Sequence, residues 1–329
     1  MDRIAIGIDV SKLTLDVALT TDGKEVVSSG QFANDAKGHK ALHKWVGKQM
    51  RKHGAGEVHY TMEATGVYSE GIHEFLSESG EMVSVENPLK IKSFAQMQMM
   101  RTKNDAVDAA IIARYAWIMK PALTPPIEPA IKRLRALARH LEHLTQRKAS
   151  EANRLESAKD TIVIKSIKDI VKRYEHQIGK VTKEIKNHID NNPDLQEQMD
   201  LLTSIPGIAD KTAGVILSEL KGETMSVKAQ VAHAGLAPRQ RVSGTSVRGK
   251  TQICKTGNAR LRKSLYMAAL SAIQHNPHVR EFYQRLVSQG KHKMVALCAC
   301  MRKLLVIALG VLRNGVPYQE DWVSKRPVG

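Results

Sequence analysis

Residues 4–9 read Ile-Ala-Ile-Gly-Ile-Asp, a run of apolar residues that ends in a carboxylate. The run is short and rich in isoleucine, so it predicts a buried strand that ends at Asp9. Two more strand patterns follow, Leu13–Leu19 and Val26–Phe32, and Asp22-Gly23 between them is typical of a tight turn. We therefore expect the first three strands to be antiparallel neighbours.

Strand and helix patterns then alternate as far as residue 119. The expected strands are Val58–Met62, which ends at Glu63, and Met82–Val85, and the expected helices are Gly38–Met50, Tyr68–Leu76 and Asp105–Met119. Three antiparallel strands followed by this alternation predict an α/β layer fold.

A proline-rich segment separates this part from the rest of the chain. Pro121, Pro125, Pro126 and Pro129 cannot continue a helix and mark a domain boundary. Beyond it, apolar residues recur every three or four positions, as in a coiled coil. They are Leu134, Leu137, Leu141 and Leu144, and later Ile178, Val181, Ile185 and Ile189. We expect a helical hairpin or a dimer arm here, ended by Asn191-Asn192-Pro193.

The C-terminal part is expected to be mostly helical, with a basic loop from Pro238 to Gly257. The predicted domains are therefore residues 1–125, 126–195 and 196–329. The cysteines form no CxxC pair, and the N-terminus shows no secretory signal. The longest apolar stretch, Met294–Leu312, is interrupted by Arg302 and Lys303, which a membrane span tolerates poorly. These features predict a soluble cytoplasmic protein.

Charge is distributed unevenly along the 329 residues, whose formal net charge is +17. Residues 1–130 hold 15 basic and 16 acidic side chains, whereas residues 204–329 hold 20 and 6. Between Arg239 and Lys263 there are eight basic side chains and no acidic one. This concentration favours a polyanion as the partner. Aromatic residues make up only 4% of the chain, so base stacking is not expected to dominate recognition.

Four carboxylates are candidates for a metal site. Asp9 and Glu63 each end a strand, and Asp105 and Asp108 are three residues apart on one helix. Groups at the carboxyl ends of neighbouring strands converge on one crevice, and hard oxygen ligands suit Mg²⁺. Two such ions would stabilise the attacking and leaving oxygens of a phosphodiester displacement. Each residue alone also fits a plain role as a turn or helix-capping acid.

Two motifs in the second half suggest contacts with nucleic-acid phosphates. Ser204-Ile205-Pro206-Gly207-Ile208, followed by Lys211, resembles a helix-hairpin-helix, although Ala209 stands where a second glycine is common. A tight turn between two helices explains it equally well. Ser243-Gly244 in the basic loop could hold a nucleophilic serine, but no general base is identifiable beside it, so a turn or a phosphate contact is the simpler interpretation. The residues expected to contact nucleic acid are Gly207, Lys211, Arg239, Arg241, Arg248, Lys250, Lys255, Arg260 and Lys263.

Six blocks of the sequence together resemble the DEDD transposases of insertion sequences, a family that includes the Piv-type DNA invertases and the bridge-RNA-guided recombinases. The blocks, in family order, are Gly7-Ile8-Asp9, residues 62–68 (MEATGVY), residues 103–109 (KNDAVDA), Ser204–Ile208, residues 234–239 (AGLAPR) and residues 243–249 (SGTSVRG).

The resemblance implies a RuvC-like (ribonuclease H-like) N-terminal domain and a C-terminal transposase domain that contains the catalytic serine. The family tetrad maps onto Asp9, Glu63, Asp105 and Asp108, and the serine onto Ser243. The implied reaction is DNA cutting and rejoining through a phosphoserine intermediate with Mg²⁺. The implied partners are donor and target DNA, a structured guide RNA and further copies of the chain, in a dimer of dimers.

Three other functions stay open from the residues. A RuvC-like junction nuclease would use the same carboxylates with water as the nucleophile. An actin-like ATPase would use Gly7-Ile8-Asp9 as part of a phosphate-binding hairpin, although no later glycine-rich nucleotide loop follows. A purely structural nucleic-acid-binding protein would not need the carboxylates at all.

Overall fold

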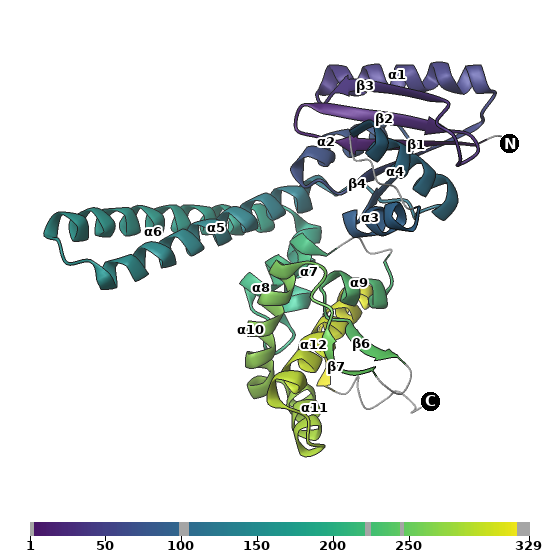
Figure 1. Ribbon diagram of the computed structural model, residues 1–329. Coiled ribbons are helices and arrows are strands. Elements are labelled where there is room, and N and C mark those ends of the chain that lie inside the picture. The colour runs from purple at the N-terminus through teal and green to yellow at the C-terminus, as the bar shows by residue number, and fades with distance from the viewer. Residues whose placement is uncertain (1–2, 99–104, 221–224, 244–246, 321–329) are drawn as a thin grey trace. The chain divides into compact units, whose positions relative to one another are not determined.

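The computed structural model describes residues 3–98, 105–220, 225–243 and 247–320; for residues 105–106 and 240–251 it describes only the backbone within these ranges. The chain divides into two compact units, Met1–Ile127 and Glu128–Gly329. The second unit contains both the predicted arm and the C-terminal part. Each unit has its own hydrophobic core and is described here by itself (Figure 1).

The first unit contains a five-stranded sheet with the order β3-β2-β1-β4-β5. The strands are β1 (Arg3–Val10), β2 (Thr14–Thr20), β3 (Ser28–Ala33), β4 (Glu57–Glu63) and β5 (Met82–Glu86). β1, β2 and β3 pair antiparallel, whereas β4 and β5 continue the sheet parallel to β1. The prediction of a mixed α/β layer is confirmed.

Helices cover both faces of this sheet. α1 (Ala36–His53) and α2 (Val67–Glu78) pack Leu42 and Ile72 into the same core as Ile6 of β1. α1 begins at the N-cap Asp35, whose carboxylate accepts from two backbone N–H groups, and ends at Gly54 in the left-handed conformation. On the other face lies α4 (Asp105–Met119), which packs against β1 and β2.

One helix of this unit was not expected from the sequence. α3 (Pro88–Met97) begins with Asn87 as N-cap and Pro88 in its first turn, a standard start signal. It is short, and it buries only Ile91 and Phe94, so its apolar pattern in the sequence is weak.

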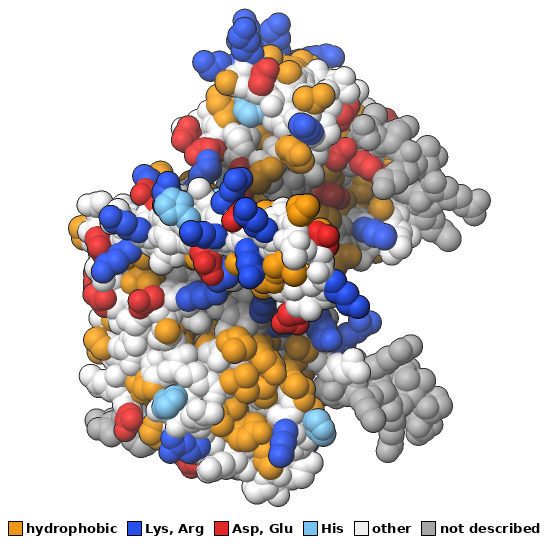
Figure 2. Space-filling view, turned by 90° about the vertical axis from the view of Figure 1, so that its left-hand side faces the viewer, with side chains coloured by type: hydrophobic (Ala, Val, Ile, Leu, Met, Phe, Trp, Pro, Cys, Tyr) orange, Lys and Arg blue, Asp and Glu red, His pale blue; other side chains and the backbone are white. Residues whose placement is uncertain are grey.

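The second unit begins with two long helices, α5 (Pro129–Ser157) and α6 (Thr161–Asp190), that form an antiparallel hairpin within one chain. Polar contacts tie the helices together along their length: Lys148 pairs with Glu175 at 2.8 Å, and Arg133 pairs with Glu184. Lys and Arg side chains cover much of this hairpin where it projects toward the viewer in Figure 2.

The rest of the second unit is a helical core. Its helices are α7 (Pro193–Thr203), α8 (Asp210–Glu219), α9 (Val227–His233), α10 (Ala259–His275), α11 (Pro277–Ser288) and α12 (Lys293–Asn314). α12 is long and apolar enough to cross a membrane, the one such helix among the described residues, but half of its apolar window is buried in the unit. Cys300, Leu304 and Ala308 of α12 are fully buried, so packing in this core explains its composition.

The prediction of a loop from Pro238 to Gly257 is wrong for most of its length. β6 (Pro238–Ser243) and β7 (Val247–Ile253) form a two-stranded antiparallel ribbon, with an irregular register between Arg239 and Arg241. The abundant glycine, serine and charged residues hide the strand pattern, because neither face of a projecting ribbon has to be apolar.

Candidate active site

The carboxyl ends of the strands bring acidic residues into one row. In the β1–β4 pair Ile8 lies beside Met62, so the next residues, Asp9 and Glu63, are neighbours. The row extends in both directions, because Asp16 of β2 pairs with Asp9, and Glu86 of β5 pairs with Glu63. Paired residues on adjacent strands point to the same face, so these four side chains share one side of the sheet.

Gly7 shows which face this is. A Cβ on Gly7 would lie 2.2 Å from both Ala109 O and Ala113 N of α4, so the helix backbone rests directly on this glycine. Asp9 follows Gly7 by two residues and therefore points to the same side. The acidic row thus lies on the face covered by α4.

The direction of α4 brings its first turn toward the acidic row. Arg3 Nη2, at the start of β1, donates to Ala116 O near the end of α4, whereas Gly7 contacts Ala109. The helix therefore runs opposite to β1. Four residues of helix span about 6 Å and two residues of strand about 7 Å, so Asp105 at the start of α4 and Asp9 lie at the same end of the unit.

The structure thus places Asp9, Glu63, Asp105 and Asp108 at one end of the first unit. Asp9, Glu63 and Asp108 are half-buried, and the side chain of Asp105 is outside the described set. Among the described residues, no three His, Cys, Asp or Glu side chains come close enough to hold a metal ion. The oxygen donors are nevertheless of the chemical type that Mg²⁺ prefers.

Two acids of this row were missed in the sequence. Asp16 accepts a hydrogen bond from Gln31 Nε2 at 2.9 Å. Glu86 is nearly buried and binds Lys90 Nζ at 2.8 Å, and burial together with the Glu86 charge raises the pKa of Tyr115. Only the strand register reveals that both belong to the row; each looks like an ordinary strand-end acid when read alone.

Ser243 lies in the second unit, at the end of β6. Its backbone pairs with Val247 of β7, and its side chain is outside the described set. The same holds for Arg241, Arg248 and Lys250, so their predicted contacts with nucleic acid stay predictions. The backbone nevertheless places Ser243 in the strand pair most distant from the base of the ribbon, where Pro238 pairs with Ile253.

The base of the ribbon is held by closely packed backbone. Cys254 N donates to Ala237 O at 2.8 Å, and Asn258 N donates to His233 O. Gly257 has φ +141°, and a Cβ there would lie 2.2 Å from His233 O, so only glycine fits where the chain leaves the ribbon. These contacts fix the direction in which the ribbon projects from the unit.

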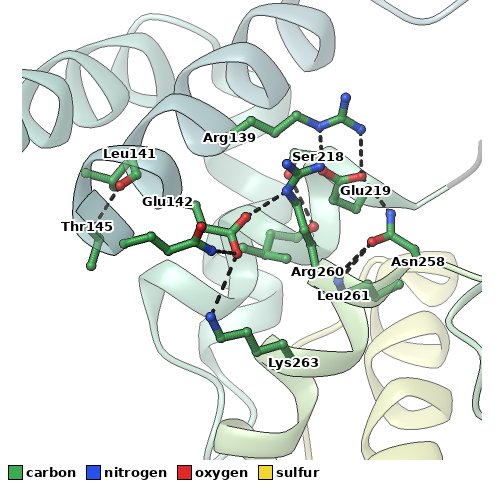
Figure 3. A network of polar contacts seen from close by, with 12 residues as sticks. Arg139, Leu141, Glu142, Thr145, Ser218, Glu219, Asn258, Arg260, Leu261 and Lys263 are labelled. Atoms are coloured by element: carbon green, nitrogen blue, oxygen red, sulfur yellow. Dashed lines mark hydrogen bonds and ion pairs between the residues drawn. The ribbon is translucent and has the colours of Figure 1, made fainter. Parts of the chain in front are cut away.

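Glu219 links this base to the α5–α6 hairpin (Figure 3). Its carboxylate is buried and accepts from Arg139 Nε at 2.8 Å, from Arg139 Nη2 at 3.0 Å and from Asn258 Nδ2 at 2.7 Å. Burial alone would raise the pKa of Glu219, but the hydrogen bonds from Arg139 and Asn258 outweigh it and lower the pKa. Glu219 is therefore held as a carboxylate.

Some of the cations expected to contact nucleic acid have protein partners. Arg260 Nε binds Glu142 Oε2 at 2.7 Å, and Lys263 Nζ lies 4.0 Å from Glu142 Oε1 (Figure 3). Lys211, Arg239 and Lys255 are exposed. Gly207 has φ +102°, and a Cβ there would lie 2.6 Å from Ala272 Cβ, so close packing against α10 is sufficient to explain this glycine.

Comparison with known proteins assigns the chain to a family. A profile described as "Transposase" matches residues 6–164, and one described as "Transposase IS116/IS110/IS902 family" matches residues 199–284. The pilin gene-inverting proteins of Moraxella lacunata and Moraxella bovis are each 31% identical to it over 324 residues, 97% of this chain and 99% of the relative. The chain belongs to the IS116/IS110/IS902 family of transposases.

An uncharacterized 43.6 kDa protein of insertion element IS110 from Streptomyces coelicolor is 32% identical over 131 residues, which is 39% of this chain and 31% of that protein. The resemblance to DEDD transposases of insertion sequences is thus confirmed. In this transposase-family chain, the first profile covers the acidic row and α4, and the second covers the ribbon with Ser243.

Proposed function

We propose that this protein is a DNA recombinase that moves or inverts a DNA segment, and that its first unit is RuvC-like. The observation that carries the proposal is the similarity, over almost its whole length, to pilin gene-inverting proteins. The strand order β3-β2-β1-β4-β5, with three antiparallel and then two parallel neighbours, supports a ribonuclease H-like fold. The row of acids on the α4 face supports a site for phosphodiester chemistry.

Asp9, Glu63, Asp105 and Asp108 would hold Mg²⁺ in this proposal. When bound, the ion would polarise the scissile phosphate and offset the negative charge that develops on it. Residues of the protein itself determine where the ion would act on the phosphate. Gly7 lets α4 approach the sheet, so the two aspartates of α4 lie at the same end as Asp9.

Ser243 is the proposed nucleophile. Its Oγ attacks phosphorus, a P–O bond of the DNA backbone breaks, and the released strand end leaves as a hydroxyl after taking up a proton. The resulting phosphoserine keeps the strand on the protein, and attack by another strand-end hydroxyl restores the serine. No general base is identifiable in the sequence around Ser243. The carboxylates would therefore activate the serine hydroxyl.

Trapping the covalent intermediate tests this assignment. Wild-type protein incubated with Mg²⁺ and a nicked substrate that cannot rejoin should give a protein–DNA adduct that survives denaturing electrophoresis. Ser243→Ala should lose the adduct yet still bind DNA, and Ser288→Ala, which removes an exposed hydroxyl on α11, should retain it. Normal strand joining by Ser243→Ala would overturn the assignment.

A metal-dependent nuclease that uses water is the second candidate. The observation that favours it is that all four acids belong to one unit, whereas Ser243 belongs to the other. Such an enzyme would cut DNA without any adduct, and Ser243→Ala would cut at the wild-type rate. Asp9→Asn should abolish cutting under either mechanism, whereas a purely structural DNA-binding protein would tolerate this change.

We further propose that the protein works inside the cell with a structured guide RNA and assembles as a dimer of dimers. The net charge supports a large polyanion partner, and the long α5–α6 hairpin is a surface on which copies could assemble as a coiled coil. Sequencing the RNA that co-purifies with the protein tests the guide. One RNA species of defined structure is expected, and a random mixture would contradict it.

A further inference from the structure

A cavity of about 800 Å³ opens at the end of the first unit's sheet that is remote from the acidic row. It is lined by Arg3 and Glu57, the first residues of β1 and β4, by His53 at the end of α1, by Trp117 near the end of α4, and by Lys120, which follows that helix. Six residues of strand separate Arg3 from Asp9, about 20 Å, so this cavity is distinct from the acidic site.

Two cations of the lining are accessible from the cavity. Arg3 is half-buried and Lys120 is exposed, so both can meet an anion that enters it. Arg3 Nε and His53 Nε2 make no hydrogen bond within the described part of the chain, but both atoms are closed off from solvent, so a ligand in the open cavity does not contact them.

Arg3 is held in place by a chain of buried polar groups. Its Nη2 donates to His59 Nδ1 at 2.9 Å, and His59 Nε2 binds Ser84 Oγ at 2.7 Å. Ser84 Oγ in turn donates to Ala122 O at 2.9 Å. Because Arg3 can only donate, His59 must be neutral with its proton on Nε2, and burial, followed by the Arg3 charge, lowers the pKa of His59 accordingly. The guanidinium is thus oriented before any ligand arrives.

Trp117 gives the cavity an aromatic wall. Its indole packs against Gly23, where a Cβ would lie 2.2 Å from Cδ1, and the Arg3 guanidinium lies 5.8 Å from the ring centroid. A fixed, partly exposed indole beside cations is the arrangement on which a nucleobase stacks while its phosphate meets the charges. The volume is in the range of sites that enclose small organic ligands.

We propose that this cavity binds one unpaired nucleotide. Arg3 and Lys120 bind its phosphate, and its base lies against Trp117. Glu57, the acid of the lining, accepts from an exocyclic amino group, so adenine, cytosine and guanine are preferred over uracil and thymine. The proposed function supplies one source, a base extruded from a nucleic-acid strand; the other source is a free nucleotide, which has the same chemistry.

Isothermal titration of the full-length protein with AMP and UMP, and with a 5′-phosphorylated adenine trinucleotide, tests the proposal. We expect AMP to bind more tightly than UMP, and Glu57→Gln to reduce that difference. Lys120→Gln should weaken AMP binding about fivefold, whereas Lys48→Gln, an exposed lysine on α1, should not change it. Trp117→Phe should retain more binding than Trp117→Leu.

The titrations distinguish a nucleotide within a strand from a free nucleotide. Tighter binding of the trinucleotide than of AMP, lost in Lys120→Gln, identifies a strand as the ligand, and equal binding identifies a free nucleotide. Failure of AMP and the trinucleotide to bind the wild-type protein, or equal binding by wild type and Lys120→Gln, would overturn the proposal. Neither result bears on the recombinase assignment, which rests on the Ser243 adduct.

Discussion

Gly7 is the residue at which the two layers of the first unit come into contact. The backbone of α4 rests on it so closely that a single added carbon would lie 2.2 Å from Ala109 O. The same contact determines how far the first turn of α4 lies from Asp9. The stability of the first unit and the geometry of the acidic row therefore both depend on position 7 being a glycine.

Gly7→Ala should destabilise the protein by roughly 1–3 kcal/mol, because the added methyl group meets backbone that cannot rotate away. It should also reduce Mg²⁺-dependent DNA cutting sharply by moving α4 away from the sheet. Gly47→Ala is the matched control: nothing lies within 4 Å of its Cβ, and alanine favours a helix interior by about 0.5–1 kcal/mol. Denaturant unfolding and a cleavage assay measure both effects; a wild-type cleavage rate for Gly7→Ala would contradict this account of α4.

His59 gives the stability of the first unit a pH dependence. Burial lowers the pKa of His59 and of His39 in the folded state, so the unfolded chain takes up protons first as pH falls below about 6.5. The free energy of unfolding should therefore fall between pH 7 and pH 5, by at most about 1.4 kcal/mol per pH unit for each histidine. His59→Gln should flatten the curve, and His39 should account for the remaining slope. An unchanged slope in His59→Gln would show that burial does not lower the pKa of His59 in solution.

Among the helices and strands, those with a pattern of apolar residues that reflects burial could be predicted from the sequence. The strand of Ile4, Ile6 and Ile8 is recognisable because alternate residues enter one core, and α1 and α2 because each turns an apolar face to that core. α4 is recognisable by its apolar composition, since it is buried both against the sheet and against α3. The ribbon β6–β7 was missed because glycine, serine and charged residues interrupt its strand pattern, and the short α3 because it buries only Ile91 and Phe94. Of the candidate site, Asp9 and Glu63 could be predicted as strand ends, but Asp16 and Glu86 join the row only through strand register.

The attachment of the α5–α6 hairpin to the ribbon depends on Glu219. Glu219→Gln should cost roughly 2–4 kcal/mol, because it leaves Arg139 without its buried partner and weakens the bond to Asn258. Glu142→Gln is the contrast, since its partners Arg260 and Lys263 are exposed; it should cost less than about 1 kcal/mol. Thermal unfolding of both variants at neutral pH measures the difference. Equal losses in the free energy of unfolding would show that Glu219 does not hold the hairpin to the base of the ribbon.

At the scale of the whole molecule, charge and chemistry are divided between the two units. Residues 1–127 hold 15 basic and 15 acidic side chains, so residues 128–329, with 35 and 18, carry the entire net charge of +17. The acidic row lies in the neutral unit and Ser243 in the basic one. In the proposed function, a neutral first unit would hold clustered carboxylates near DNA without being repelled as a whole, and the second unit would supply the attraction.

Separate production of the two units tests this division. Each has its own core, and the boundary falls in a proline-rich segment, so fragments 1–127 and 128–329 should each unfold cooperatively. Fragment 128–329 should bind duplex DNA with an affinity that falls steeply between 50 and 200 mM salt, about 10³-fold if six phosphates are neutralised. Fragment 1–127 should bind duplex DNA weakly and nearly independently of salt. A fragment 1–127 that binds duplex DNA as tightly as the full chain would show that binding depends on local surface charge in the first unit, and that the net charge of the second does not determine where DNA is held.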